Sequence, residues 1–484
     1  MSSSSLCYQA ATELADLIRG REVSARQVVS DHLDQIDRLN GDINAICTLI
    51  EPEEALKQAD AIDEKIRNGD EVGPLAGLPI AIKDLVATAG IRTTMGSLLF
   101  QDHVPDTDAL FVERIRNAGA IIIGKTNTPE FGAGSNTFNQ VFGITRNPYD
   151  LNKTVGGSSG GAAAALASCM LPIADGSDLG GSLRNPAGFC NVVGFRPSIG
   201  RVPSYPQLMI WQSRLSTEGP MARNVRDCAL LYSVMAGPDD RDPVSQLLSP
   251  ATGDSLEMQT KGSVIGWSTD LGGLPVEPEI TRVFNKAREG FLQLGCELDD
   301  SPVDLREAMD VFKVIRAHYY AESTRAFFPE HRDILKATLV RNIEAGHRLT
   351  GMDLSQAGTK RTKIFYRMRE YFQHHDFLVV PTAQVEAFDT ETEWVQQING
   401  VELQDYIDWM SICCVVTVTG LPSISVPAGF TESGMPTGLQ IIGGPGRDWD
   451  VLRMANMFER ASQFGDRRPA LCQPAADEGS AATL

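Results

Sequence analysis

The 484-residue sequence has no long hydrophobic run, and this absence excludes a protein with membrane-spanning helices. No apolar stretch approaches the roughly 20 residues that a helix needs to cross a bilayer. The start, Met1-Ser2-Ser3-Ser4-Ser5, also lacks the basic segment followed by an apolar one that marks a secretory signal. We therefore expect a cytoplasmic protein with no membrane partner.

Positive charge is also scarce. Lys and Arg total 43 against 62 Asp and Glu, which gives a formal net charge of −19. Proteins that bind nucleic acid draw much of their affinity from basic side chains that neutralise phosphates. The sequence has no basic stripe that would offset its deficit, so we expect no nucleic-acid partner.

Histidines and cysteines spaced as in metal or redox motifs are missing as well. The seven His residues show no metal-site spacing, and the nine Cys residues are odd in number and scattered. Cys413 and Cys414 are adjacent rather than spaced as in zinc or dithiol motifs. The sequence therefore predicts buried thiols, no metal site and no cofactor.

What is present is the composition of an ordinary globular protein, with 42% hydrophobic and 22% charged residues. A capping-box pattern at Ser24 and Gln27 predicts a helix, and Leu78–Ile82 is a short apolar run typical of a buried strand. Similar runs alternate with helical patterns along the chain, which predicts an α/β protein with a largely parallel sheet. The expected strands are Ala120–Ile123, Val264–Trp267, Phe377–Val380, Ile424–Val426 and Leu439–Ile442.

Three further segments have a distinct character. Thr107–Asn117 has a helical pattern, and the alanine-rich stretch Ala162–Ser168 predicts a buried helix that starts at a glycine pair. Helical patterns rich in charge and aromatics fill 300–400, which we interpret as a cap over the sheet. The tail, 469–484, is small and polar and is expected to be flexible.

Two glycine-rich segments carry serines, namely Gly156–Gly161 and Asp178–Arg184. Glycine allows backbone conformations in which successive N–H groups converge on one point while a neighbouring hydroxyl stays uncovered. These are the features of an acyl-transfer site.

Three other interpretations compete for the first segment. Gly156–Gly160 fits the G-x-S-x-G nucleophile elbow, but that motif requires an apolar strand before it, and 147–153 is polar and interrupted by proline. A phosphate-binding loop would need a Walker or dinucleotide fingerprint, and neither is present. A purely structural glycine loop remains a common alternative.

The serine segments combine with other motifs into a pattern that resembles the amidase signature family. The resemblance spans most of the chain, and its motifs occur in order: Gly77–Asp84, Gly124–Phe131, Phe142–Pro148, Gly156–Gly161, Asp178–Arg184, Gly194–Ser198, Glu218–Arg223 and Gly420–Pro427. The departures are small, since the family more often has Ile at Leu183, Lys at Arg196 and Thr at Ser198. None of these is a reacting group.

The resemblance implies a Ser-Ser-Lys triad, with Ser182 as nucleophile, Ser158 as bridging serine and Lys83 as base. The family's 24-residue interval between its two serines selects Ser158 over Ser159. A lysine acts as a base only when it is neutral, and burial after an apolar strand would lower the pKa of Lys83 accordingly.

Other roles follow from the same segments. We expect the backbone N–H groups of the nucleophile loop to form an oxyanion hole; the loop residues are Leu179, Gly180, Gly181 and Ser182. The flanking charged residues Asp178 and Arg184 are expected to support the loop. Gly132 is expected to bind the substrate.

The resemblance thus implies one amidase domain over 1–468, an α/β/α sandwich around a mixed, largely parallel sheet with the cap within it. The expected reaction is hydrolysis of the C–N bond of a neutral carboxamide, such as an aryl amide or a carbamate, through an acyl-enzyme. The alternatives are the glutamine-hydrolysing component of a tRNA-dependent amidotransferase and a non-catalytic binding protein. The expected partner is a small-molecule amide, with a homodimer left open.

Overall fold

The computed structural model describes residues 6–212, 214–245, 255–301 and 303–472. Within these residues no helix is both long enough and apolar enough to cross a membrane. The helices are α1 (Ala11–Arg19), α2 (Ala25–Ile43), α3 (Pro52–Asn68), α4 (Leu110–Asn117), α5 (Gly160–Ala167), α6 (Arg184–Phe189), α7 (Val225–Met235), α8 (Pro278–Lys286), α9 (Arg288–Gln293), α10 (Ala308–Ser323), α11 (Phe328–His331), α12 (Ala337–His347), α13 (Gly351–Tyr371), α14 (Ser411–Thr419) and α15 (Asp448–Ser462).

An eight-stranded sheet forms the centre of the fold. Its strands lie in the order β12 (Glu297–Asp299), β11 (Val264–Trp267), β13 (Phe377–Pro381), β17 (Pro436–Gly443), β16 (Ser423–Phe430), β9 (Val193–Arg196), β10 (Thr217–Ala222) and β8 (Ile173–Asp178). A smaller sheet has the order β1 (Ile46–Leu49), β3 (Ile121–Thr126) and β2 (Pro79–Lys83). Three two-stranded pairs complete the set: β4 (Phe138–Asn139) with β5 (Gly143–Ile144), β6 (Arg146–Asn147) with β7 (Asp150–Thr154), and β14 (Gln397–Ile398) with β15 (Val401–Glu402).

The large sheet is mixed, as expected, but the prediction that it is largely parallel is wrong. Only β11 pairs in parallel, with β12 and β13, and the other five neighbouring pairs are antiparallel. Apolar runs are typical of parallel strands, because such strands are normally covered on both faces. Here antiparallel strands are covered on both faces as well, so the same apolar runs arise.

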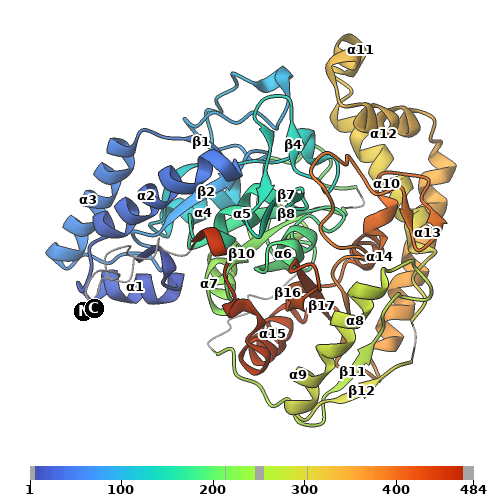
Figure 1. The fold of residues 1–484 in the computed structure, drawn as a ribbon. Coiled ribbons are helices and arrows are strands. Elements are labelled where there is room, and N and C mark those ends of the chain that lie inside the picture. The colour runs from blue at the N-terminus through green and yellow to red at the C-terminus, as the bar shows by residue number, and fades with distance from the viewer. Residues whose placement is uncertain (1–5, 213, 246–254, 302, 473–484) are drawn as a thin grey trace, which may run out of the picture.

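Alternate residues of β13 show this double coverage. Phe377 and Val379 enter one hydrophobic core, together with side chains of α7 and α15, whereas Leu378 and Val380 enter a second core with side chains of α10, α13 and α14. Figure 1 shows α10–α13 on one side of the molecule and α1–α3 on the opposite side. The layered α/β/α arrangement follows from a sheet that buries both of its faces.

Local sequence signals agree with most of the other expected elements. Helix α2 begins after Ser24, whose Oγ accepts the Gln27 N–H at 3.0 Å while Gln27 Oε1 accepts the Ser24 N–H at 2.8 Å. Helix α4 covers the end of the expected 107–117 segment, starting at Leu110. In the predicted tail, Ala470–Cys472 forms a 3-10 turn with Cys472 buried, and 473–484 lies outside the described residues.

Helix α5 follows the first serine segment and is buried along its whole length. A Cβ on Gly161 would lie 2.3 Å from the backbone nitrogen of Asn127 and 2.5 Å from the carbonyl oxygen of Ala45. The small side chains therefore let α5 pack directly against the backbone of neighbouring segments, which sets the position of the serines at its N-terminus.

We predict that Gly161→Ala lowers the free energy of unfolding by about 1–3 kcal/mol, because its methyl group would overlap rigid backbone atoms. The matched control is Gly358→Ala in α13, where a Cβ meets nothing within 4 Å. That change should stabilise the protein by up to about 1 kcal/mol through helix propensity. Urea unfolding curves measure both, and equal effects at the two positions would contradict the packing argument.

Candidate active site

Lys83 is the last residue of β2 and is fully buried. Its backbone N–H donates to Asp175 Oδ1 of β8 at 2.9 Å, which links the end of the small sheet to the edge strand of the large one. The lysine Nζ lies 2.7 Å from Ser158 Oγ, 2.8 Å from Ser159 Oγ and 3.0 Å from Ser177 Oγ. The amine is thus held by three hydroxyl groups.

The environment favours the neutral form of this amine. Burial lowers the pKa of Lys83 to about 7, against a smaller opposing effect of the carboxylates of Asp175, Asp178 and Glu218. At neutral pH a substantial fraction of the lysine is therefore unprotonated and able to accept a proton.

The two serine segments are in direct contact. The Ser159 N–H donates to the carbonyl oxygen of Ser182 at 3.2 Å. A cavity of about 300 Å³ lies beside them, and Ser158 and Ser182 both line it, whereas Ser159 does not. Ser159 is fully buried and its Oγ accepts the Ser177 N–H at 3.3 Å. Of the two neighbouring serines that contact Lys83, Ser158 is therefore the one that faces the cavity.

Gly132 lies on the same cavity, at the end of a 3-10 turn (Glu130–Gly132). Its φ is +67°, and a Cβ there would lie 2.8 Å from Leu85 Cδ1 and 3.4 Å from Ser158 Oγ. A larger residue would enter the space next to the Ser158 hydroxyl. The structure thus brings the four predicted residues Lys83, Ser158, Ser182 and Gly132 to one place.

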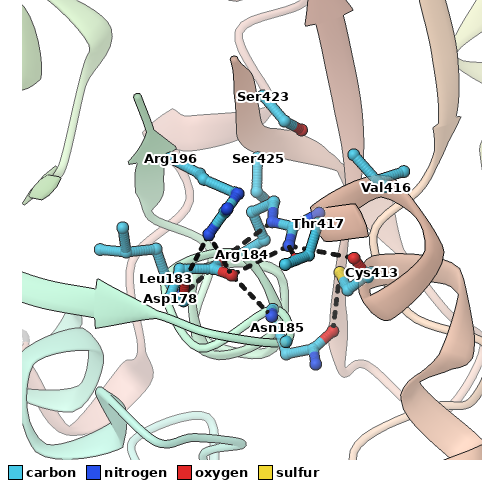
Figure 2. Close-up of polar contacts among 12 residues, drawn as sticks. Asp178, Leu183, Arg184, Asn185, Arg196, Cys413, Val416, Thr417, Ser423 and Ser425 are labelled. Atoms are coloured by element: carbon cyan, nitrogen blue, oxygen red, sulfur yellow. Dashed lines mark hydrogen bonds and ion pairs between the residues drawn. The ribbon is translucent and has the colours of Figure 1, made fainter. Parts of the chain in front are cut away.

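A buried carboxylate shapes the loop that carries Ser182. Asp178 accepts the Gly181 N–H at 2.8 Å on Oδ1 and the Leu183 N–H at 3.2 Å on Oδ2. Arg184 donates to both oxygens, from Nε at 2.9 Å and from its second guanidinium nitrogen at 3.0 Å. Figure 2 shows the carboxylate between Arg184 and Arg196, the latter at 3.2 Å from Oδ1.

The charges in this network compensate one another. Burial raises the pKa of the Asp178 carboxyl, but Arg184 and Arg196 outweigh that effect and hold the pKa well below its usual range. Arg184 also donates to Gln440, Thr417 and the carbonyl oxygen of Cys413. The loop is therefore tied to β17 and α14 through one guanidinium.

The expected oxyanion donors differ in their availability. The Gly181 N–H is occupied by Asp178. Within the described part of the chain, the N–H groups of Leu179, Gly180 and Ser182 donate to no backbone or side-chain acceptor. Leu179 and Ser182 line the cavity, and Gly180 lies between them in the same loop without lining it.

Sequence reasoning missed three polar residues of the site. Ser177 contacts the lysine amine, Asp175 holds its backbone, and Glu218 lines the cavity. Ser177 and Asp175 lie just before the Asp178 segment, and Glu218 begins the segment Glu218–Arg223. Their roles depend on strand register, because Glu218 of β10 pairs with Ser177 of β8.

We predict that Asp178→Asn destabilises the fold by about 3–5 kcal/mol, since it leaves two buried guanidinium groups without their anion. The matched control is Asp304→Asn, whose partner Arg306 is exposed, and which should cost no more than about 1 kcal/mol. Chemical denaturation compares the two variants. A cost for Asp178→Asn as small as that of the control would mean that the network adds little stability.

Comparison with known proteins agrees with this geometry. The family model described as Amidase matches residues 27–452. The chain is 35% identical to one of the subunits of the glutamyl-tRNA(Gln) amidotransferase of Moorella thermoacetica, in an alignment that covers 96% of this chain and 99% of that protein. It is 33% identical to an acylamidase of Rhodococcus erythropolis, with 97% and 99% covered.

A solved structure is similar over the same length. The crystal structure of a bacterial aryl acylamidase of the amidase signature family superposes with a TM-score of 0.88 at 33% identity, covering 96% of this chain and 99% of that one. Together, the family match and these full-length relatives show that the chain belongs to the amidase signature family of enzymes, which hydrolyse amide C–N bonds.

Proposed function

We propose that this chain is an amidase that hydrolyses the C–N bond of a neutral carboxamide through Ser182, Ser158 and Lys83, with an acyl-enzyme intermediate. One observation carries the proposal. A buried lysine amine with a pKa of about 7 lies 2.7 Å from the hydroxyl of Ser158, and Ser158 shares a cavity with Ser182. Aryl amides and carbamates fall within the proposed substrate class.

In the proposed first step, the neutral amine of Lys83 takes the proton of Ser158, which in turn takes the proton of Ser182. The Ser182 oxygen attacks the carbonyl carbon, and the C=O electron pair moves to oxygen. The free N–H groups of Leu179, Gly180 and Ser182 are suited to hydrogen-bond that charge, and one such donor typically contributes roughly 3–4 kcal/mol. Gly181 supports the hole through its bond to Asp178.

The C–N bond then breaks as the proton returns along the same route to the leaving nitrogen. The products are the free amine and an ester on Ser182. Water attacks this ester with the same groups acting as base, and the acid leaves as Ser182 regains its proton. Asp178 and Arg184 act by fixing the loop, and Gly132 leaves room for the substrate beside Ser158.

The helices within 300–400 contribute to the proposed site as well. Tyr319 and Tyr320 of α10 line the cavity. We therefore keep the interpretation of this region as a cap within one catalytic domain over 1–468. The cytoplasm remains the expected compartment.

A glutamine-hydrolysing component of an amidotransferase is the second candidate, favoured by the 35% identity to such a protein. Glutamine carries an α-carboxylate, and such a group is normally met by a basic side chain. Among the described residues that line the cavity none is Lys, Arg or His. The cavity thus favours amides without a carboxylate, and a rate of ammonia release from glutamine below the rate of aniline release from acetanilide would agree with this choice. A non-catalytic binding protein would not account for a buried lysine that, among the described residues, has hydroxyl partners but no ion-pair partner.

We predict that Ser182→Ala abolishes both anilide hydrolysis and covalent labelling by a fluorophosphonate probe, because Ser182 is the nucleophile of the proposed mechanism. The matched control is Ser216→Ala, a cavity serine without a bond to Lys83 in the described structure, which should still be labelled. Mass spectrometry of the labelled peptides shows whether each variant carries the probe. If the Ser182→Ala protein is still labelled, Ser182 is not the nucleophile.

We also predict the pH dependence. Since the reaction needs neutral Lys83, kcat/KM for a neutral anilide should rise about tenfold per pH unit below pH 7 and level off above it. Asp175→Asn removes a carboxylate that raises the pKa of Lys83, so it should move the midpoint to lower pH. If the midpoint stays in place or moves to higher pH, the rise in kcat/KM below pH 7 does not report the titration of Lys83.

A further inference from the structure

The cavity beside Ser182 has a strongly one-sided charge. Among the described residues that line it, Glu218 has the single carboxyl group, and none is Lys, Arg or His. The remaining lining is apolar or carries hydroxyl and amide groups, such as Ser204, Ser216 and Gln207. A substrate that enters the cavity therefore meets one carboxyl group among the lining residues, while the Lys83 amine lies behind Ser158 and Ser177, and Arg214 lines an adjoining pocket.

Strand register places this carboxyl group on the same side of the sheet as the reacting groups. Glu218 of β10 lies directly opposite Ser177 of β8 in an antiparallel pair, and side chains that oppose each other in this way share one face of the sheet. Ser177 Oγ lies 3.0 Å from Lys83 Nζ. The Glu218 side chain thus projects beside the lysine and its serines.

One oxygen of the carboxyl group is held and the other remains available. Ser204 Oγ donates to Oε2 at 2.7 Å, and the Ser204 backbone N–H donates to Asp242 at 2.9 Å. Among the other described residues none donates a hydrogen bond to Oε1, although the backbone N–H of Glu218 itself also acts on the carboxyl group. Burial raises the pKa of Glu218, and the Ser204 hydrogen bond acts in the opposite direction. A ligand that donates to Oε1 would complete the hydrogen bonding of the group.

We propose that Glu218 is a specificity residue that binds an amino or ammonium group of the substrate, and that it excludes substrates with a carboxylate at that place. The inference rests on the proposed amidase function and narrows it: the scissile amide is neutral, and a second group of the substrate donates hydrogen bonds. A cation next to a carboxylate in a cavity of low polarity is strongly favoured, whereas a second anion there is repelled.

The test measures binding in the Ser182→Ala background, so that it does not depend on turnover. One probe series varies the acyl side: the 4-nitroanilides of β-alanine, of butanoic acid and of succinic acid, which end in an ammonium, a methyl and a carboxylate group. The other varies the amine side: acetanilides with a 4-aminomethyl or a 4-ethyl group. Calorimetry gives the ratio of dissociation constants between the charged and the neutral member of each series.

The ammonium member should bind at least about tenfold more tightly than its neutral counterpart in one of the two series. Glu218→Gln keeps the size and an acceptor for Ser204, and should bring that ratio close to one. Ser204→Ala is the matched control, because it removes the tether and keeps the charge, so the preference should persist. If Glu218 had only a structural role, Glu218→Gln and Ser204→Ala would change the ratio of dissociation constants to the same extent.

Two results would overturn the proposal. One is a ratio that Glu218→Gln leaves unchanged, and the other is the absence of a preference for the ammonium member in both series, or no binding of either ammonium amide. The amidase function is judged separately, by whether the unmodified protein releases 4-nitroaniline from the butanoyl anilide. Failure of one assay therefore does not imply failure of the other.

Discussion

The site depends on a lysine amine that is buried without an anion in contact. Among the described residues, no carboxylate forms an ion pair with Lys83, and its Nζ is surrounded by the hydroxyls of Ser158, Ser159 and Ser177. Hydroxyl groups satisfy the hydrogen bonding of an amine in either protonation state, but they do not stabilise its positive charge as a carboxylate would. The neutral form becomes accessible near pH 7 because burial lowers the pKa of Lys83 and no carboxylate in contact offsets that effect among the described residues.

The nearby carboxylate of Asp178 is also buried, but unlike the Lys83 amine it is surrounded by groups of opposite charge. Two guanidinium groups and two backbone N–H groups surround its carboxylate, so it stays ionised and holds a loop in place. Removing solvent from a charge is costly unless partners replace the lost hydration. The buried charge of Asp178 is therefore fully compensated, whereas that of Lys83, which moves a proton in the proposed mechanism, is compensated only in part.

Local signals in the sequence were sufficient for many of the elements. The capping box at Ser24 and the apolar run before Lys83 each predict an element that the structure contains, because both depend on neighbours within a few residues. Strand direction was not predictable in this way. Antiparallel and parallel strands that are covered on both faces have the same apolar composition, so β16 and β17 carry no local sign of their pairing.

Within the site, too, some features were predictable from the sequence and others were not. The resemblance to the amidase signature family indicated Lys83, Ser158 and Ser182, and the structure brings them together. It did not indicate that Ser159 and Ser177 also contact the lysine, or that Glu218 faces the cavity. These contacts arise where β2, β8 and β10 meet, and that meeting is set by long-range packing rather than by any residue in the motifs.

The glycines behind Ser182 have a further consequence. A Cβ on Gly180 would lie 2.6 Å from Phe312 of α10, and one on Gly181 would lie 2.5 Å from the Cβ of Cys413 on α14. Two helices thus form a solid wall directly behind the loop amides. In the proposed mechanism, negative charge develops on the substrate oxygen, and loop dipoles backed by these two helices would have little freedom to reorient, so the reorganisation energy would be small. The two helices would then contribute to catalysis without contacting the substrate oxygen.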